Sequence, residues 1–453
     1  MIPTSESNPP FEDSVREWSE LRNRSGDVRD LSRAEPDATY RLQFHAGFTF
    51  RDASALVPYL AALGITHVYA SPFLKAVEGS SHGYDIVDQS SLNPEIGSQD
   101  DFDDFVDELH ANGLGQILDV VPNHMGVASN DNVWWRDVLE NGPSSIYASF
   151  FDIDWMPLKP DLANKVLLPV LADQFGRVLE AGQLTLCFEE GAFYVKYFDR
   201  SFPIGMRSSS ILLSHRLDVL EQLLSSGHSG DPLLSGPSAE KNPGGGETTE
   251  TAELMEYRSI LTAISHLAPR TETDPNKNDE RRREQEVIKR RLRELCQNSS
   301  VINAFLIENV RLFNGCPGDP SSFDLLDHLL LEQAYRLAYW RVAADEINYR
   351  RFFDVNELAA ICMDRPEVFE KTHSLIFRMV EQGQIDGLRI DHPDGLYDPS
   401  KYLRQLQLHG SQHRMGSSNS ANLQRKTDTA FEIEDSPHGG CLVQIGSEGN
   451  TPL

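Results

Sequence analysis

The amino-acid sequence predicts an α/β fold with a parallel sheet at its centre. Four short stretches have the composition of buried strands, at about 38–44, 65–71, 115–121 and 385–391. The second and third run directly into Pro72 and Pro122, and proline cannot continue a ladder of backbone hydrogen bonds. Helical periodicity separates the first three strands and precedes the fourth. Strands that alternate with helices in this way are typical of βα units, whose strands pair in parallel.

Two helices are predicted between the first three strands. The first covers 51–64, and its apolar face would comprise Leu56, Tyr59, Leu60 and Leu63. The second covers 98–112, where Ser98 can cap the helix and an aspartate-rich first turn suits the positive end of the helix dipole. Its buried stripe would comprise Phe102, Phe105, Val106 and Leu109.

The chain leaves the βα pattern after the third strand. Residues 127–225 are irregular and aromatic, and 225–250 form a linker rich in glycine, serine and proline. Helices are predicted at about 280–297, 299–313 and 323–346, and a last one begins at Asp364 and leads into the fourth strand.

These patterns predict five segments along the chain. They are a disordered arm (1–37), three strands with their helices (38–126), an inserted subdomain containing the linker (127–345), the end of the insertion with the fourth strand (346–408), and a low-complexity tail without further strands (409–453).

The composition narrows the class of protein. The net charge of −28 disfavours nucleic acid and anionic membranes as partners, and fits an enzyme that acts on a neutral substrate. Five scattered cysteines form no paired motif, which favours reduced thiols and a cytoplasmic location. We expect no signal peptide at the N-terminus, and no run approaches the roughly 20 apolar residues of a membrane span.

Polar side chains gather where three of the predicted strands end. In parallel sheets the carboxyl ends of the strands form the edge at which catalysis occurs. The candidates are His82, Tyr84 and Asp85 after the second strand, Asp119, Asn123 and His124 at the third, and Arg389, Asp391 and His392 at the fourth.

The fourth strand carries the most informative pair. Because side chains alternate along a strand, Arg389 and Asp391 share one face, and we expect the strand to persist to His392, the residue before Pro393. The guanidinium would keep the carboxylate ionised, and an ionised carboxylate can attack the anomeric carbon of a sugar. A plain structural ion pair is the alternative for this strand, as a salt bridge or loop cap is for Asp119.

Several runs resemble the maltooligosyltrehalose synthase family of the alpha-amylase superfamily. DVVPNH (119–124) and GLRID (387–391) resemble two conserved regions of the superfamily. The runs that are similar to the narrower family are TYRLQF, YASPFLKA, GSSHGYDIVD, LNPEIG, VPNHMG, FFDIDW, YRRFFDVNEL and DGLRIDHPDGLYDP. The resemblance covers roughly 38–200 and 300–405.

This resemblance implies a (β/α)8 barrel that isomerises the reducing-end α-1,4 link of a maltooligosaccharide to an α,α-1,1 link, without cofactor or metal. Asp391 would be the nucleophile and Arg389 would hold it charged. The substrate would be bound by His82, Tyr84, Asp85, Asp119, Asn123, His124 and His392, with Tyr84 as a stacking platform. Trp134 and Trp135 could help to exclude water, or could be ordinary subdomain core.

One departure from the family qualifies these expectations. Retaining glycosidases need a second carboxyl group as acid/base, and the family's glutamate run on the next strand is absent here. With only about four barrel strands visible, we expect this chain to be inactive or weak alone, and a complementing chain could supply the rest. The alternatives are a non-catalytic glucan-binding or split-enzyme subunit, a maltooligosaccharide-acting glycoside hydrolase, and a metal-dependent hydrolase using His82, His124, Asp119 and Asp391.

Overall fold

The computed structural model describes residues 36–225, 251–414 and 440–444. The chain divides into two compact units: unit 1 comprises the residues up to Asp131 and from Arg351 onward, and unit 2 comprises Asn132–Arg350. The predicted arm, the predicted linker and most of the predicted tail fall outside the described residues.

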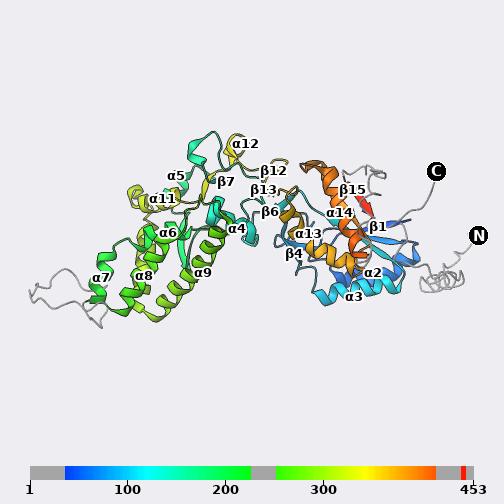
Figure 1. The fold of residues 1–453 in the computed structure, drawn as a ribbon, viewed down its shortest axis with the longest axis horizontal. Helices are drawn as coiled ribbons and strands as arrows, with labels where there is room; N and C mark the ends of the chain where they lie inside the picture. Colours follow the sequence, from blue (N-terminus) through cyan, green and yellow to red (C-terminus); the bar gives the residue numbers. More distant parts are fainter. Residues whose placement is uncertain (1–35, 226–250, 415–439, 445–453) are drawn as a thin grey trace, which may run out of the picture. The chain divides into compact units, whose positions relative to one another are not determined.

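Unit 1 is built on a sheet with the strand order β1-β2-β5-β14-β15 (Figure 1). Its strands are β1 (Thr39–Leu42), β2 (His67–Ala70), β5 (Gly115–Val120), β14 (Gly387–Asp391) and β15 (Gly440–Gln444). The first four strands pair in parallel, as the sequence predicts, whereas β15 pairs antiparallel with β14. The expectation that no strand follows the fourth is therefore wrong, because the free edge of β14 takes a partner from the predicted tail.

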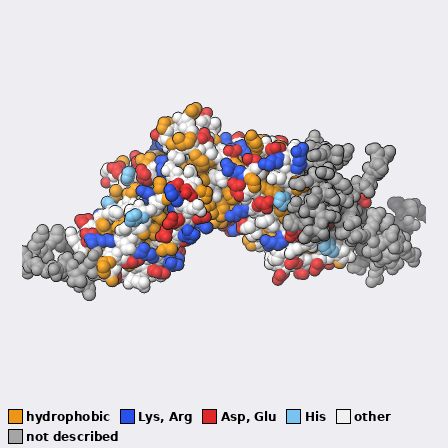
Figure 2. All heavy atoms as spheres, viewed as in Figure 1, with side chains coloured by type: hydrophobic (Ala, Val, Ile, Leu, Met, Phe, Trp, Pro, Cys, Tyr) orange, Lys and Arg blue, Asp and Glu red, His pale blue; other side chains and the backbone are white. Residues whose placement is uncertain are grey.

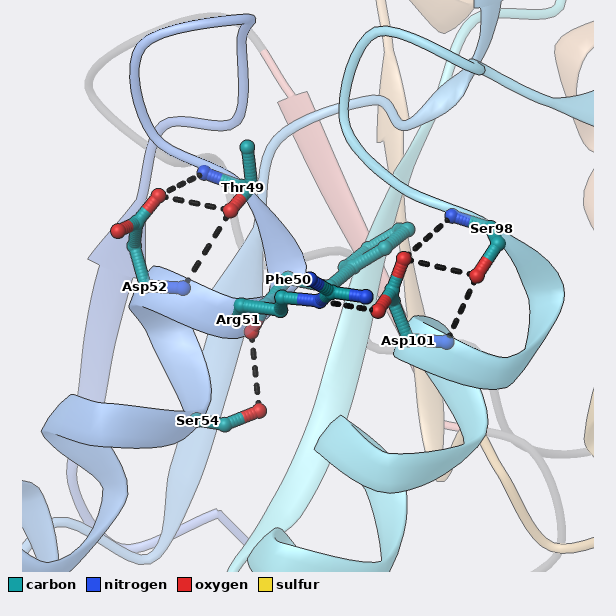
Figure 3. Close-up of polar contacts among 7 residues, drawn as sticks. All are labelled: Thr49, Phe50, Arg51, Asp52, Ser54, Ser98 and Asp101. Carbon is teal, nitrogen blue, oxygen red and sulfur yellow. Dashed lines mark hydrogen bonds and ion pairs between the residues drawn. The ribbon is translucent and has the colours of Figure 1, made fainter.

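Two helices with matching caps follow β1 and precede β5, namely α2 (Phe50–Ala62) and α3 (Gln99–Ala111) (Figure 1). Thr49 and Ser98 each cap a helix, and the carboxylates of Asp52 and Asp101 bond back to the cap residues, so both helix starts are capping boxes (Figure 3). Arg51 of α2 reaches Asp101 of α3 and ties the two helix starts together. Figure 2 shows acidic side chains gathered over α3.

The buried face of α2 differs from the predicted one. The structure buries Phe50, Ala53, Val57 and Leu60, whereas Leu56, Tyr59 and Leu63 are exposed. The physical reason is the cluster of phenyl rings beneath the helix: Phe50 packs against Phe73, Phe102 and Phe105 and so sets the rotation of α2. The stripe predicted for α3 is buried as expected.

The rest of unit 1 comprises short strands and two further helices. Its elements are β3 (Leu74–Ala76), β4 (Ile86–Leu92), β6 (His124–Gly126), β12 (Arg351–Phe352), β13 (Val355–Ala360), α13 (Pro366–Glu381) and α14 (Pro399–Arg414). Strands β12, β13 and β6 form a small antiparallel sheet. Asp364 is not the cap of α13, since Pro366 occupies the first helical turn and makes Arg365 the boundary residue.

Unit 2 combines helices with two small sheets, one of three strands (β10-β9-β8) and one of two (β11-β7). The helices are α4 (Val133–Asn141), α5 (Phe175–Glu180), α6 (Met206–Leu213), α7 (Leu217–Ser225), α8 (Ala252–His266), α9 (Pro275–Asn298), α10 (Ser300–Phe313), α11 (Asp324–Leu331) and α12 (Ala343–Glu346). The strands are β7 (Val166–Leu171), β8 (Thr185–Glu189), β9 (Ala192–Tyr197), β10 (Arg200–Pro203) and β11 (Tyr335–Tyr339).

Two sequence expectations change in unit 2. The helix predicted over 323–346 is interrupted, because Tyr335–Tyr339 pairs in parallel with β7 and buries the Tyr335 ring. Trp134 and Trp135 are buried against aromatic rings of the same unit, including Phe150 and Phe151, which favours the interpretation as ordinary core. In the described ranges, no helix has both the length and the apolar character needed to cross a bilayer.

The revised face of α2 leads to a matched pair of substitutions. Leu60→Ala removes a side chain that is 1% exposed, and we expect a loss of about 2–5 kcal/mol in the stability of unit 1, while Leu63→Ala, at 54% exposure, should change it by less than about 0.5 kcal/mol. Hydrogen exchange of peptides from α2 and β1 would measure both. Equal losses would contradict the observed rotation of α2.

Candidate active site

The parallel register aligns a row of polar side chains across unit 1. Arg41 of β1 pairs with Tyr69 of β2, and Arg389 of β14 pairs with Asp119 of β5. Tyr69 in turn pairs with Ile117, two residues before Asp119. Residues two apart share a face, so the four polar side chains extend from the same side of the sheet near its carboxyl edge.

Asp119 is the hub of this row. Its side chain is 0% exposed, and it accepts hydrogen bonds from the Tyr69 and Tyr84 hydroxyls at 2.6 Å each and from Arg389 Nη1 at 2.8 Å. A buried carboxylate is costly unless donors surround it, and here three donors do. Of the alternatives that the sequence leaves open for Asp119, the structure contains the buried salt bridge.

Arg389 connects Asp119 to the end of β14. Its Nη1 atom also donates to Asp391 Oδ1 at 2.5 Å, so one guanidinium bridges two carboxylates. Burial lowers the pKa of Arg389, but the charges of Asp119 and Asp391 outweigh it and the net shift is upward. Arg389 therefore stays charged in this setting.

The same cluster raises the pKa of Asp391. Burial is the largest cause, Arg389 opposes it, and the negative charge of Asp119 adds to it. With Arg389 as its only charged neighbour, Asp391 would stay ionised. In the structure Asp119, a more deeply buried carboxylate, also binds Arg389. Asp391 therefore holds its negative charge less easily than it would in a simple ion pair.

The loop after β2 brings three predicted site residues together. The Tyr84 hydroxyl bonds to Asp119, and its backbone N–H donates to His82 Nδ1 at 3.0 Å. Asp85 accepts from the Ser80 hydroxyl and lies 3.8 Å from His82 Nδ1. Gly83 has φ +77°, and a side chain there would collide with the Pro72 carbonyl, so glycine lets this loop fold against the end of β2.

His124 and His392 both contact one phenyl ring. Phe352 of β12 has ring-centroid distances of 4.3 Å to His124 and 4.9 Å to His392. His124 Nε2 also contacts the Tyr84 carbonyl at 3.2 Å, and the neighbouring Asn123 is buried beside Gly395.

The strand does not persist to His392, as the sequence analysis expected. His392 has φ +45° and ψ +55°, the left-handed conformation, which is sparsely populated by residues other than glycine. The ring contacts with Phe352 and Phe353 and the ion pair with Asp394 at 3.7 Å accompany this conformation. The preference of a residue before proline for extended geometry yields here to side-chain packing.

Sequence reasoning missed Arg41 and Tyr69 in this region, and it named Phe352 and Phe353 only within the run YRRFFDVNEL, without giving either residue a role. Arg41 donates to the Tyr84 hydroxyl at 3.0 Å, and its guanidinium carbon lies 5.3 Å from the centre of the Tyr69 ring. Alternation predicts which residues share a face within each strand, but only the register of β1 with β2 sets Arg41 beside Tyr69. No local pattern could bring Phe352 to the two histidines, since that contact depends on how β12 and β13 return to β6.

The described residues contain no group of three or more histidine, cysteine or acidic side chains that could hold a metal ion. The metal-dependent hydrolase considered from the sequence would need His82, His124, Asp119 and Asp391 to converge. Instead Asp119 is surrounded by Tyr69, Tyr84 and Arg389. What the arrangement can supply chemically is a partly buried carboxylate at a strand end, with a fixed cation beside it.

This chain is similar to alpha-amylases and to maltooligosyl trehalose synthases. Residues 53–226 match the family model described as "Alpha amylase, catalytic domain". A putative maltooligosyl trehalose synthase of Mycobacterium tuberculosis is 29% identical over 377 residues, covering 82% of this chain and 32% of the relative. An intracellular maltogenic amylase of Bacillus subtilis is 38% identical over 103 residues, covering 23% of this chain and 17% of the relative.

Solved structures give the same result. The maltooligosyltrehalose synthase of Arthrobacter ramosus is 30% identical, with a TM-score of 0.52, over 83% of this chain and 33% of that one. A hypothetical maltooligosyl trehalose synthase of Sulfolobus tokodaii is 26% identical, with a TM-score of 0.50, over 83% of this chain and 34% of that one. The resemblance predicted from the sequence is confirmed, the fold is of the alpha-amylase type, and the chain spans about a third of the length of these relatives.

The shared carboxylate predicts a change in tyrosine ionisation. Burial, followed by the charge of Asp119, raises the pKa of Tyr69 to about 12. Asp119→Asn should lower this pKa towards its ordinary value of about 10, because the negative charge that opposes tyrosinate is removed. Ultraviolet absorbance during alkaline titration measures the effect, and a Tyr69→Phe variant assigns it. Asp107→Asn on the exposed face of α3 is the matched control, and an unshifted Tyr69 in Asp119→Asn would contradict the geometry.

The raised pKa of Asp391 predicts a pH-dependent gain in stability. A group whose pKa is higher in the folded state contributes stability below its unfolded pKa and loses it as pH rises through the folded value. Asp391→Asn should therefore raise the free energy of unfolding of unit 1 at pH 7, with a smaller gain at pH 4. Urea unfolding at both pH values measures this, with the exposed Asp394→Asn as control. A loss of stability at pH 7 would count against the assigned direction.

Proposed function

We propose that this chain, which is similar to maltooligosyl trehalose synthases over 83% of its length, acts on α-1,4-glucans by forming a covalent glycosyl-enzyme on Asp391. The observation that carries the proposal is the buried bridge from Asp119 through Arg389 to Asp391, at the end of β14. A retaining mechanism needs a carboxylate whose position is fixed and whose charge is balanced by a neighbour. This cluster meets both requirements.

The other residues receive roles that follow from their positions. Arg389 balances the charge of the nucleophile and Asp119 holds Arg389 in place. Around this pair we assign His82, His124, His392 and Tyr84 to sugar binding, and Asp85 and Asn123 to support of the rim. The hydrogen bond from the Tyr84 hydroxyl to Asp119 supports its assignment as a platform, because it fixes the ring without using its faces.

The proposed reaction is intramolecular transglucosylation, in which the reducing-end α-1,4 link of a maltooligosaccharide becomes an α,α-1,1 link. Asp391 would attack the anomeric carbon and release the terminal glucose. That glucose would turn over and attack the same carbon through its own anomeric hydroxyl, before water can do so. Water exclusion therefore decides between isomerisation and hydrolysis.

Because the chain spans about a third of its relatives' length, the architecture around the site is part of the proposal. We interpret β1, β2, β5 and β14 as the first four strands of a (β/α)8 barrel, and unit 2 as an insertion after the third. The general acid would come from the polypeptide that supplies the other strands, whether a continuation of this chain or a complementing chain. The cytoplasmic location expected from the cysteines stays a prediction.

A substrate that needs no general acid tests the covalent step directly. In 5-fluoro-α-glucosyl fluoride the leaving group departs as fluoride while the Asp391 carboxylate bonds to the anomeric carbon, so the nucleophile suffices for labelling. We expect mass spectrometry of peptides to locate one glucosyl adduct on Asp391, and no adduct in Asp391→Asn. The Asp107→Asn variant, on the exposed face of α3, should be labelled like the wild type.

The outcomes separate the candidate functions. An adduct with no turnover of maltopentaose supports the need for a complementing polypeptide. Loss of reducing ends from maltopentaose supports isomerisation by this chain alone, while a gain of reducing ends supports a hydrolase. Binding of maltopentaose without any adduct would point to the non-catalytic glucan-binding alternative.

A further inference from the structure

The hairpin of β12 and β13 ends in an exposed phenyl ring beside the candidate nucleophile's strand. Phe353 is 73% exposed and has φ +50°, so a large apolar side chain is both solvated and held in a left-handed backbone. Each of these features is unfavourable for phenylalanine, and residues held this way cluster at functional sites. The combination calls for a reason beyond folding.

A comparable hairpin in unit 2, formed by β9 and β10, shows which features are particular to the β12–β13 hairpin. Phe198 is also followed by an aspartate, has φ +54° and is 76% exposed. Its ring packs against its own neighbour, Tyr197, at 4.7 Å. Exposure and strain are thus common to both turns, and the difference lies in what surrounds Phe353.

Phe353 stands in a row of rings that reaches the site. Its centroid lies 4.5 Å from Phe352 and 5.7 Å from His392, and the interplanar angle with His392 is 89°. Phe352 in turn contacts both His392 and His124. His392 directly follows Asp391. The contacts of Phe353 with His392 and with Phe352 therefore hold its exposed phenyl ring at the rim of the Asp391 site.

We propose that Phe353 is a stacking platform for one glucose unit of a linear α-1,4-glucan at the rim of the Asp391 site. This inference rests on the proposed function and adds to its binding residues Phe353, which lies in the run YRRFFDVNEL. A pyranose ring offers an apolar C–H face and a polar edge. Phe353 supplies the apolar surface, and the imidazole of His392 and the carboxylate of Asp394, 3.7 Å apart, supply hydrogen-bonding groups beside it.

The size of the feature favours a sugar over a protein partner. A stable protein interface buries about 800 Å² on each side with a cluster of apolar anchors, whereas this rim offers one phenyl ring flanked by charged and polar groups. Glucan recognition uses single aromatic faces with adjacent hydrogen-bonding groups, which is the chemistry present here.

The β12–β13 and β9–β10 hairpins allow a test in which the second hairpin is the matched control. Asparagine tolerates left-handed backbone, so Phe353→Asn removes the ring while relieving strain, and Phe198→Asn makes the same change away from the site. With the full chain and maltopentaose, isothermal titration should show about tenfold weaker binding for Phe353→Asn and unchanged binding for Phe198→Asn and for Phe353→Trp. Thermal unfolding should show that neither asparagine variant is destabilised.

Each outcome bears on the proposal. Wild-type affinity in Phe353→Asn would overturn it while leaving the proposed function intact, as would an equal loss in Phe198→Asn. If the wild-type chain itself does not bind maltopentaose, the platform fails, whereas the proposed function is decided separately by the Asp391 adduct from the glucosyl fluoride. Weaker binding of maltopentaose confined to Phe353→Asn would support the platform.

Discussion

One buried ion pair organises the chemistry of unit 1. Asp119 is removed from solvent and depends on the hydroxyls of Tyr69 and Tyr84 and the guanidinium of Arg389 for its charge. Removal of one partner from a buried pair leaves an uncompensated charge, so these groups constrain each other strongly. Their common consequence is that Arg389 stays beside Asp391 and fixes the position of that carboxylate, while burial and the charge of Asp119 raise its pKa.

The rim above this pair is held by packing rather than by charge. Phe352 contacts both His124 and His392, and the left-handed backbone of His392 redirects the chain directly after Asp391. A strand that simply continued would carry His392 to the opposite face of the sheet, because side chains alternate. The local strain at this residue thus serves to turn an imidazole towards the aromatic row, and strain of this kind persists only where the surroundings compensate for it.

Local patterns were reliable where one local rule decided the outcome. Ser98 caps α3 as expected, and β1, β2, β5 and β14 lie within the four apolar runs that were predicted as strands. They failed where a distant partner competed. Phe73, which directly precedes β3, and Phe102 of α3 set the rotation of α2 by packing against Phe50. Tyr335–Tyr339 pairs with β7 instead of continuing a helix. In both cases tertiary burial exceeded the small differences in local propensity.

The sequence by itself determined the parallel βα pattern, the residues at the strand ends and the resemblance to maltooligosyltrehalose synthases, because these depend on residue type and short-range order. Only the tertiary structure decided which of those residues meet. The register between β5 and β14 set Asp119 against Arg389, and the return of the β12–β13 hairpin brought Phe352 to both His124 and His392. Asp119 and Arg389 are 270 residues apart, and no local pattern encodes the register or the path that brings such segments together.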